Sequence, residues 1–106
     1  MPKKKVIKII HELIKLIKEQ FPDLQGLYLY GSQVKGGATK DSDIDVVAIF
    51  DEVSYEKTFE ICGILGELDY KYDTYIDFKP YTIKELERNP IYYDEVTNKG
   101  IYYAAA

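Results

Sequence analysis

A Gly-Ser pair and two closely spaced aspartates make one segment of this chain suited to chemistry. Gly31-Ser32 is followed, after ten residues, by Asp43-Ile44-Asp45, within the run LYLYGSQVKGGATKDSDIDVVAIF. Backbone N–H groups in a glycine-bearing turn can hold phosphate oxygens, and carboxylate oxygens are ligands that Mg²⁺ accepts. The spacing therefore predicts phosphoryl chemistry on a metal-bound nucleotide.

The residues around this segment predict a strand on each side of a loop. Residues 27–30 alternate in type and end at a glycine, and residues 46–50 form a continuous apolar run rich in β-branched side chains. Side chains alternate along a strand, so Asp43 and Asp45 are expected on one face, about 6–7 Å apart. Like charges this close repel each other unless a cation lies between them. Ile44 is expected to point into the core.

Two helices are expected to support these strands. Apolar residues recur at helical spacing in the N-terminal segment, which predicts an amphipathic helix that ends near Phe21-Pro22. A second helix is expected over residues 55–68, with Phe59, Cys62 and Leu65 among its apolar positions. Cys62 is expected to pack there as a small hydrophobic side chain.

The C-terminal third predicts one more strand and two short helices. Residues 74–81 alternate, which places Asp77 on the face opposite the apolar side chains. Residues 82–85 have a capping-box pattern, and Asn89-Pro90 restarts a helix with proline at its first position. Gly100 is expected to stop that helix, and the chain is expected to continue without a regular element.

The expected order is helix, strand, strand, helix, strand, helix, helix. This order predicts the α/β (α+β) class, as a small mixed β-sheet with helices packed mainly on one face. A chain of 106 residues suits a single domain, residues 1–106, with one core.

Composition argues against several classes of protein. The net charge of −4 disfavours a protein that coats nucleic acid, because such binding needs clustered positive charge. The single cysteine excludes an internal disulfide and favours a reducing, cytoplasmic compartment. No apolar run approaches the roughly 20 residues that span a bilayer, and the N-terminus lacks the pattern of a secretory signal.

The Gly-Ser and Asp-x-Asp pairs at this distance are similar to the signature of the polymerase-β-like nucleotidyltransferase superfamily. The chain most resembles its minimal, MNT-type branch, since Gly36, Ala38 and residues 41–45 also fall where that branch has them. The C-terminal residues 89–103 resemble the end of these small domains. The resemblance implies a nucleotidyltransferase fold over about the whole chain.

The resemblance also implies a reaction, the Mg²⁺-dependent transfer of a nucleoside monophosphate to a hydroxyl acceptor. AMP from ATP is the favoured donor group. Gly31 and Ser32 would hold the triphosphate, while Asp43 and Asp45 would bind magnesium. Asp77 would complete one metal site and help to deprotonate the acceptor. Asp73 competes for this third position, but it is expected in the turn before the strand.

Two departures from the branch concern the loop after the serine. Arginine is common directly after the serine and two positions later, where this chain has Gln33 and Lys35. Lys35 and Lys40 either act as point charges on phosphate or are solvated loop lysines. Asp41 is expected to form a turn, and Ser42 to cap the loop or orient the next aspartate.

The expected partner is also implied by the resemblance, which points to a helical HEPN protein in a toxin–antitoxin couple. A tyrosine of that protein is one candidate acceptor. The chain has eleven tyrosines, and those clustered near its end either cover the sheet or form a partner surface. Neither a membrane nor direct nucleic-acid binding is expected, and the oligomeric state stays open.

Two other functions stay open. The first is a binding module with a weak or inactive site that neutralises a HEPN-type partner by contact. The second, less favoured because the chain has no second substrate-binding domain, is a nucleotidyltransferase that modifies a small molecule such as an antibiotic.

Overall fold

The structure is a computed structural model that describes residues 2–39 and 41–105. Its elements follow the chain in this order: α1 (Lys4–Gln20), β1 (Leu24–Tyr30), α2 (Ser32–Lys35), β2 (Ile44–Phe50), α3 (Tyr55–Tyr72), β3 (Ile76–Tyr81), α4 (Ile83–Glu87), α5 (Pro90–Thr97) and β4 (Ile101–Ala104). Across these residues every helix is too short or too polar to span a lipid bilayer.

The strands form one mixed sheet in the order β3-β2-β1-β4. β1 runs antiparallel to both β2 and β4, whereas β2 and β3 run parallel and are joined by α3. Parallel neighbours need such a crossover because a short turn cannot return the chain to the starting edge. The predicted α/β class with a small mixed sheet is confirmed.

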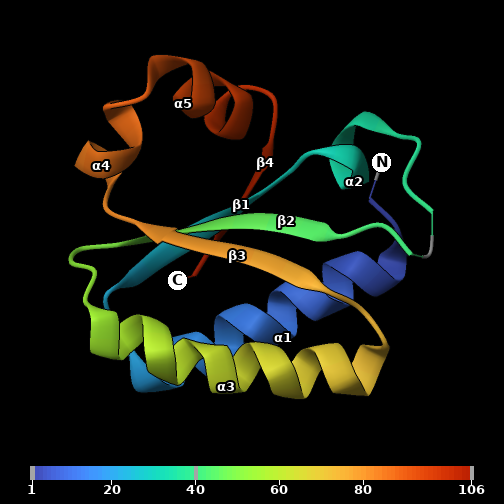
Figure 1. Ribbon diagram of the computed structural model, residues 1–106, viewed down its shortest axis with the longest axis horizontal. Coiled ribbons are helices and arrows are strands. Elements are labelled where there is room, and N and C mark those ends of the chain that lie inside the picture. The colour runs from blue at the N-terminus through green and yellow to red at the C-terminus, as the bar shows by residue number, and fades with distance from the viewer. Residues whose placement is uncertain (1, 40, 106) are drawn as a thin grey trace.

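The two long helices, α1 and α3, lie side by side against one face of the sheet (Figure 1). The apolar residues of α1 recur three and four positions apart, so one stripe of the helix faces the strands. The core between the helices and this face includes Ile9, Ile10, Leu13, Ile17, Leu27, Leu29, Ile44, Val46, Ala48, Phe50, Ile61, Ile64 and Leu68. The helices therefore lie mainly on one face, as predicted.

The short helices α4 and α5 pack on the opposite face, toward one end of the sheet (Figure 1). The predicted capping box begins α4, where Thr82 and Glu85 each accept the other's backbone N–H, at 3.2 and 2.9 Å. Asn89 caps α5, and Pro90 is its first residue. A smaller apolar cluster lies beneath them, made of Tyr30, Val47, Ile49, Leu86 and Val96.

The expectation of an irregular end after Gly100 is wrong, because residues 101–104 form β4 against β1. Glycines permit this pairing. A Cβ added to Gly26 would lie 2.6 Å from the Tyr103 carbonyl oxygen, and one on Gly100 would lie 2.8 Å from the Leu29 carbonyl oxygen. A glycine inside a strand pattern often marks such a close backbone approach.

The predicted packing of Phe59 and Cys62 in the core is also wrong. Phe59 is 72% exposed and Cys62 is exposed, while Ile61, Ile64 and Leu68 of the same helix are buried. These three aliphatic residues are three and four positions apart and form the stripe that faces α1 and the sheet. That stripe rotates Phe59 and Cys62 toward solvent.

The outer edge of β3 offers few free backbone donors. The N–H of Ile76 donates to a carboxylate oxygen of Asp69, in α3, at 2.9 Å, and so points away from β2. Pro80, four residues further along the same strand, faces the same edge and has no N–H to donate. β3 is therefore partly closed on the side away from the sheet.

Candidate functional site

Three strands bring the predicted site residues to one end of the sheet. Asp45 of β2 is the register partner of Tyr30 in β1 on one side and of Asp77 in β3 on the other. Residues at the same level of neighbouring strands present their side chains to the same face. Asp45 and Asp77 therefore lie side by side, one residue from the Gly31 loop.

Gly31 is required at its position for two reasons. Its backbone has φ 76° and ψ −150°, a region that residues with a Cβ rarely adopt. A Cβ built there would also lie 2.5 Å from Oδ2 of Asp45. The turn into α2 is thus packed directly against the central carboxylate.

The environment of Asp45 disfavours its charged form. Burial of the side chain raises its pKa, and the negative charges of Asp77 and Asp43 raise it further. Lys79 acts in the opposite direction. Asp45 is therefore a half-buried carboxylate held among like charges.

Lys79 is the cation at this group, and sequence reasoning gave it no role. Its Nζ donates to Oδ1 of Asp77 at 3.1 Å. Burial lowers the pKa of Lys79, but the hydrogen bond to Asp77 and the charges of Tyr92, Asp77 and Asp45 outweigh this effect and raise it overall. Alternation along residues 74–81 already placed it two residues after Asp77, on the same face.

The choice between Asp73 and Asp77 is resolved by position. Asp73 ends α3 with φ 52°, in the left-handed region, and its side chain is exposed. Asp77 is the residue that pairs with Asp45 across β2 and β3. Asp73 is thus a residue of the turn before β3, as its sequence position predicted.

The side chains of Asp43, Asp45 and Asp77 offer only oxygen ligands, and oxygen is the ligand type that a hard divalent cation such as Mg²⁺ prefers. A cation there would also relieve the repulsion that raises the pKa of Asp45. Within residues 2–39 and 41–105, however, no three acidic, histidine or cysteine side chains are gathered closely enough to hold a metal ion. Asp43 is exposed, just before β2, and would have to turn toward the other two.

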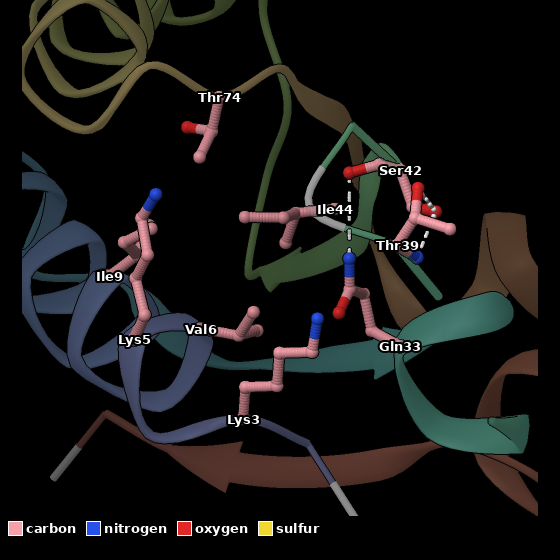
Figure 2. A pocket seen from close by; sticks show the side chains of 9 residues that line it. All are labelled: Lys3, Lys5, Val6, Ile9, Gln33, Thr39, Ser42, Ile44 and Thr74. Carbon is pink, nitrogen blue, oxygen red and sulfur yellow. Dashed lines mark hydrogen bonds between the residues drawn. The ribbon is translucent and has the colours of Figure 1, made fainter. Parts of the chain in front are cut away.

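Gln33 holds the loop that carries Asp43, a role that the sequence did not suggest. Its side chain is 6% exposed, and its Nε2 donates to the carbonyl oxygens of Asp43 and Ser42 at 3.2 and 3.5 Å. Figure 2 shows the Gln33 side chain reaching from α2 toward Ser42. The only sequence signal of this role was the glutamine at a position where the resemblance leads one to expect arginine.

Thr39, Asp41 and Ser42 make the turn contacts that were predicted from the aspartate and the serine. The Ser42 hydroxyl accepts the N–H of Thr39 at 2.8 Å, so it caps the loop. Asp41 is exposed, and its N–H donates to the Thr39 hydroxyl at 3.3 Å. Lys40, one of the two lysines considered for phosphate, lies outside the described residues.

A cavity of about 80 Å³ lies behind this loop, on the helix side of the sheet (Figure 2). Val6, Ile9 and Ile44 line its apolar part, and Lys3 and Lys5 lie at its rim. Ile44 points to the face opposite the one that carries Asp45, because the two are neighbours in β2. The cavity is therefore separate from the carboxylates.

Ser32 and Lys35 differ in how they relate to the site. Ser32 is half-buried and is the first residue of α2, next to Gly31. Lys35, at the end of that helix, forms an ion pair with Glu95 of α5. Both side chains are partly solvated, so this surface pair contributes little to stability. Lys35 is thus engaged with α5.

Two tyrosines border the carboxylates on the α5 side. The hydroxyls of Tyr30 and Tyr92 lie 2.7 Å apart, and their rings meet edge to face. Burial raises the pKa of Tyr30, and the charges of Asp45 and Asp77 add to this effect. Burial and the hydrogen bond to Tyr30 raise the pKa of Tyr92 as well. Both phenols therefore stay protonated beside the carboxylates at neutral pH.

One protein of Methanocaldococcus jannaschii is similar in sequence over most of this chain. The Methanocaldococcus jannaschii protein described as a protein adenylyltransferase is 28% identical over 91 residues, which cover 79% of this chain and 90% of that protein.

Two solved structures share the fold. One, from Shewanella oneidensis, contains a tri-AMPylated HEPN toxin in complex with an MNT antitoxin, and its matched chain has a TM-score of 0.60 at 19% identity, over 92% of this chain and 70% of that chain. The other is a toxin–antitoxin complex with AMP-PNP, with a TM-score of 0.62 at 21% identity, over 87% and 70% of the two chains. Likeness at these identities concerns the fold.

The family model described as a nucleotidyltransferase domain matches residues 10–103, which include all three aspartates and the Gly-Ser pair. This match spans nearly all of the elements described above and agrees with the fold of the solved structures. The chain therefore belongs to the nucleotidyltransferase domain family.

Proposed function

We propose that this protein is an Mg²⁺-dependent adenylyltransferase that transfers AMP from ATP to a hydroxyl group. The observation that carries the proposal is the pairing of Asp45 with Asp77 across two parallel strands, with Gly31 packed against Asp45. This arrangement juxtaposes a phosphate-binding turn and acidic oxygen ligands, which phosphoryl transfer from a nucleotide requires.

Each residue has a role in this proposal. The turn at Gly31 and Ser32 would bind the triphosphate, and Asp43, Asp45 and Asp77 would hold magnesium, which would supply Lewis-acid stabilisation of the charge on the phosphates. Asp77 accepts the proton of the attacking hydroxyl. The bond from the acceptor oxygen to the α-phosphorus forms as the bond to the β-phosphate oxygen breaks, and pyrophosphate leaves.

Nucleotide binding also explains why the carboxylates are kept under repulsion. Burial and the neighbouring aspartates raise the pKa of Asp45, so the ligand-free site holds excess negative charge in a partly desolvated place. A magnesium ion held by these oxygens would offset their mutual repulsion, so the three carboxylates would favour a nucleotide that carries the cation.

We further propose that the acceptor is a protein hydroxyl, with a tyrosine of a HEPN-type partner as the first candidate. This proposal is supported by two relatives, the Methanocaldococcus jannaschii protein described as a protein adenylyltransferase and the Shewanella oneidensis complex with its AMPylated HEPN toxin. It is also supported by the open placement of Asp77, whose side chain is 37% exposed at the sheet end.

The test is incubation with magnesium and ATP labelled at the α-phosphate, with and without a HEPN-type protein as the candidate partner. We expect one or more adenylyl groups on a partner tyrosine, located by peptide mass spectrometry, together with pyrophosphate release. ATP labelled at the γ-phosphate serves as the control and should leave the partner unlabelled. Release of phosphate in place of pyrophosphate would contradict the proposed reaction.

One observation favours a second candidate, a module that neutralises its partner by contact. In the described part of the chain the carboxylates are not gathered into a metal site. If this candidate is right, inhibition of the partner needs no ATP and survives Asp45→Asn. If the protein acts as an adenylyltransferase, inhibition is lost when ATP is omitted and is also lost in the Asp45→Asn variant.

A further inference from the structure

Tyr75 directly precedes β3, the strand that carries Asp77. Its carbonyl oxygen accepts the backbone N–H of Ile44 at 2.9 Å, which places it next to the segment that links Asp43 and Asp45. It also precedes Asp77 by two residues. The backbone of Tyr75 is therefore tied to the same strand pair that carries the proposed metal ligands.

The side chain of Tyr75 belongs to the face that carries the carboxylates. Its neighbour Thr74 lines the cavity on the helix side together with Ile44 (Figure 2), and its other neighbour, Ile76, is buried in the core on that side. Because side chains alternate along extended backbone, Tyr75 points to the opposite face, where Asp77 lies. It is 59% exposed.

Tyr75 also lies on the side of the site where an acceptor would bind. The proposed triphosphate turn follows β1, the two metal-binding aspartates belong to the β2 segment, and Asp77 belongs to β3. The sheet order places β2 between the other two strands. Tyr75, which directly precedes β3, therefore lies across the carboxylates from the triphosphate turn.

Five other tyrosines of the described residues have hydroxyls that are engaged or lie at a distance. Tyr30 and Tyr92 bond to each other, Tyr72 donates to Glu12, and Tyr102 donates to a backbone carbonyl. Tyr55 is 88% exposed, but it begins α3, which follows the opposite end of β2. Tyr75 combines an exposed ring with a position at the carboxylates.

We propose that Tyr75 is an internal acceptor, so that the protein adenylylates its own tyrosine at its own site. The inference rests on the proposed adenylyltransferase function. The Tyr75 hydroxyl oxygen forms a bond to the α-phosphorus of ATP, and the bond between that phosphorus and the β-phosphate oxygen breaks. Pyrophosphate leaves with the electron pair, and the phenolic proton passes to the Asp77 carboxylate and then to water.

The test uses the full chain alone with magnesium and ATP labelled at the α-phosphate. We expect one adenylyl group per chain, and peptide mass spectrometry should place it on Tyr75. Tyr75→Phe should remove this group, whereas the matched control Tyr55→Phe should leave it unchanged. Asp45→Asn should abolish it, which excludes a contaminating enzyme.

Dilution tests whether the reaction occurs within one site. An internal acceptor predicts that the fraction modified per unit time does not depend on protein concentration. A rate that rises in proportion to concentration would overturn the proposal, and so would an adenylyl group on Tyr55 or Tyr70 with Tyr75 unmodified.

Failure of this inference is distinguishable from failure of the proposed function. If the HEPN-type partner is adenylylated but Tyr75 stays unmodified, Tyr75 is not an acceptor and the adenylyltransferase stands. If neither the partner nor Tyr75 gains an adenylyl group and no pyrophosphate appears, both proposals fall.

Discussion

The two faces of β2 are made by alternating residues of one short strand, and at the start of this strand they differ in polarity and in burial. Ile44, Val46 and Ala48 point toward α1 and α3 and are at most 1% exposed. Between them, Asp45 points to the other face and meets Asp77 in the neighbouring strand. At this end of β2, one face therefore packs the main core while the other carries charge, although Val47 and Ile49 further along that second face are buried beneath α4 and α5.

This difference separates stability from chemistry at the level of neighbouring residues. Truncation of a side chain on the apolar face lowers the free energy of unfolding, because the core is close-packed. The acidic face carries mutual repulsion, which raises the pKa of Asp45 and weakens the fold when that residue is ionised. Substitutions one position apart should therefore have opposite effects on stability and activity.

Asp45→Asn should produce the largest effect on activity. The proposed site loses a metal ligand, and we expect adenylyl transfer to fall by at least about a hundredfold, the lower range for one positioned catalytic group. The melting temperature should stay equal or rise, since the change removes a charge held among like charges. Pyrophosphate release and thermal unfolding measure the two effects. A variant that keeps full turnover would break the comparison.

Ile44→Ala should show the opposite pattern. The side chain is 1% exposed, and truncation of a buried isoleucine costs about 2–5 kcal/mol of unfolding free energy. Well below its lowered melting temperature, the folded fraction should still transfer adenylyl groups. Denaturant unfolding followed by circular dichroism measures the loss. A loss below the quoted range would mean that this face is less tightly packed than the structure indicates.

Gly31→Ala tests the contact between the turn and Asp45, and Gly36→Ala is its matched control. Both glycines have φ between 76° and 94° with extended ψ, a backbone region where a Cβ costs about 1–3 kcal/mol. An added Cβ meets the Asp45 carboxylate at 2.5 Å in the first case and nothing within 4 Å in the second. We expect both to lose stability and Gly31→Ala alone to lose most activity. Equal activities would show that the contact with Asp45 is unimportant.

The smallest expected effect is a dependence of stability on pH that comes from Asp45. Its pKa is raised in the folded state above the ordinary value of 3.8, so the folded protein keeps the proton longer than the unfolded chain. The stability that Asp45 contributes is thus lost as pH rises from about that value through its raised pKa. The unfolding free energy of the wild type minus that of Asp45→Asn should fall across this range. An increase would contradict the assigned repulsion.

Much of the fold could be predicted from the sequence because its elements have strong local signals. The α1 stripe, the apolar run of β2 and the capping box of α4 each follow from spacing or cap chemistry, and all three are present. β4 could not be predicted in this way. Its four residues carry no alternation, and it forms because β1 offers a free edge and Gly26 lets the backbones approach.

The site was predictable in its residue types but not in its connections. The spacing of the aspartates predicts that Asp43 and Asp45 share a face, and Asp77 was assigned from the resemblance to the family. The hydrogen bonds from Gln33 and the ion pair of Lys35 with Glu95 depend on tertiary contacts between residues about 10 and 60 positions apart. Sequence periodicity carries no information about such pairs.

The outer edge of β3 limits how a second protein can reach the acidic end of the sheet. The N–H of Ile76 is already occupied by Asp69, and Pro80 has no N–H. An incoming chain that approaches as an added strand therefore finds few backbone donors to pair with, and accidental edge-to-edge association is discouraged there. Recognition of a protein that offers its hydroxyl to this end then rests mainly on side chains, so the choice of client can change by surface substitution while the backbone of the sheet stays the same.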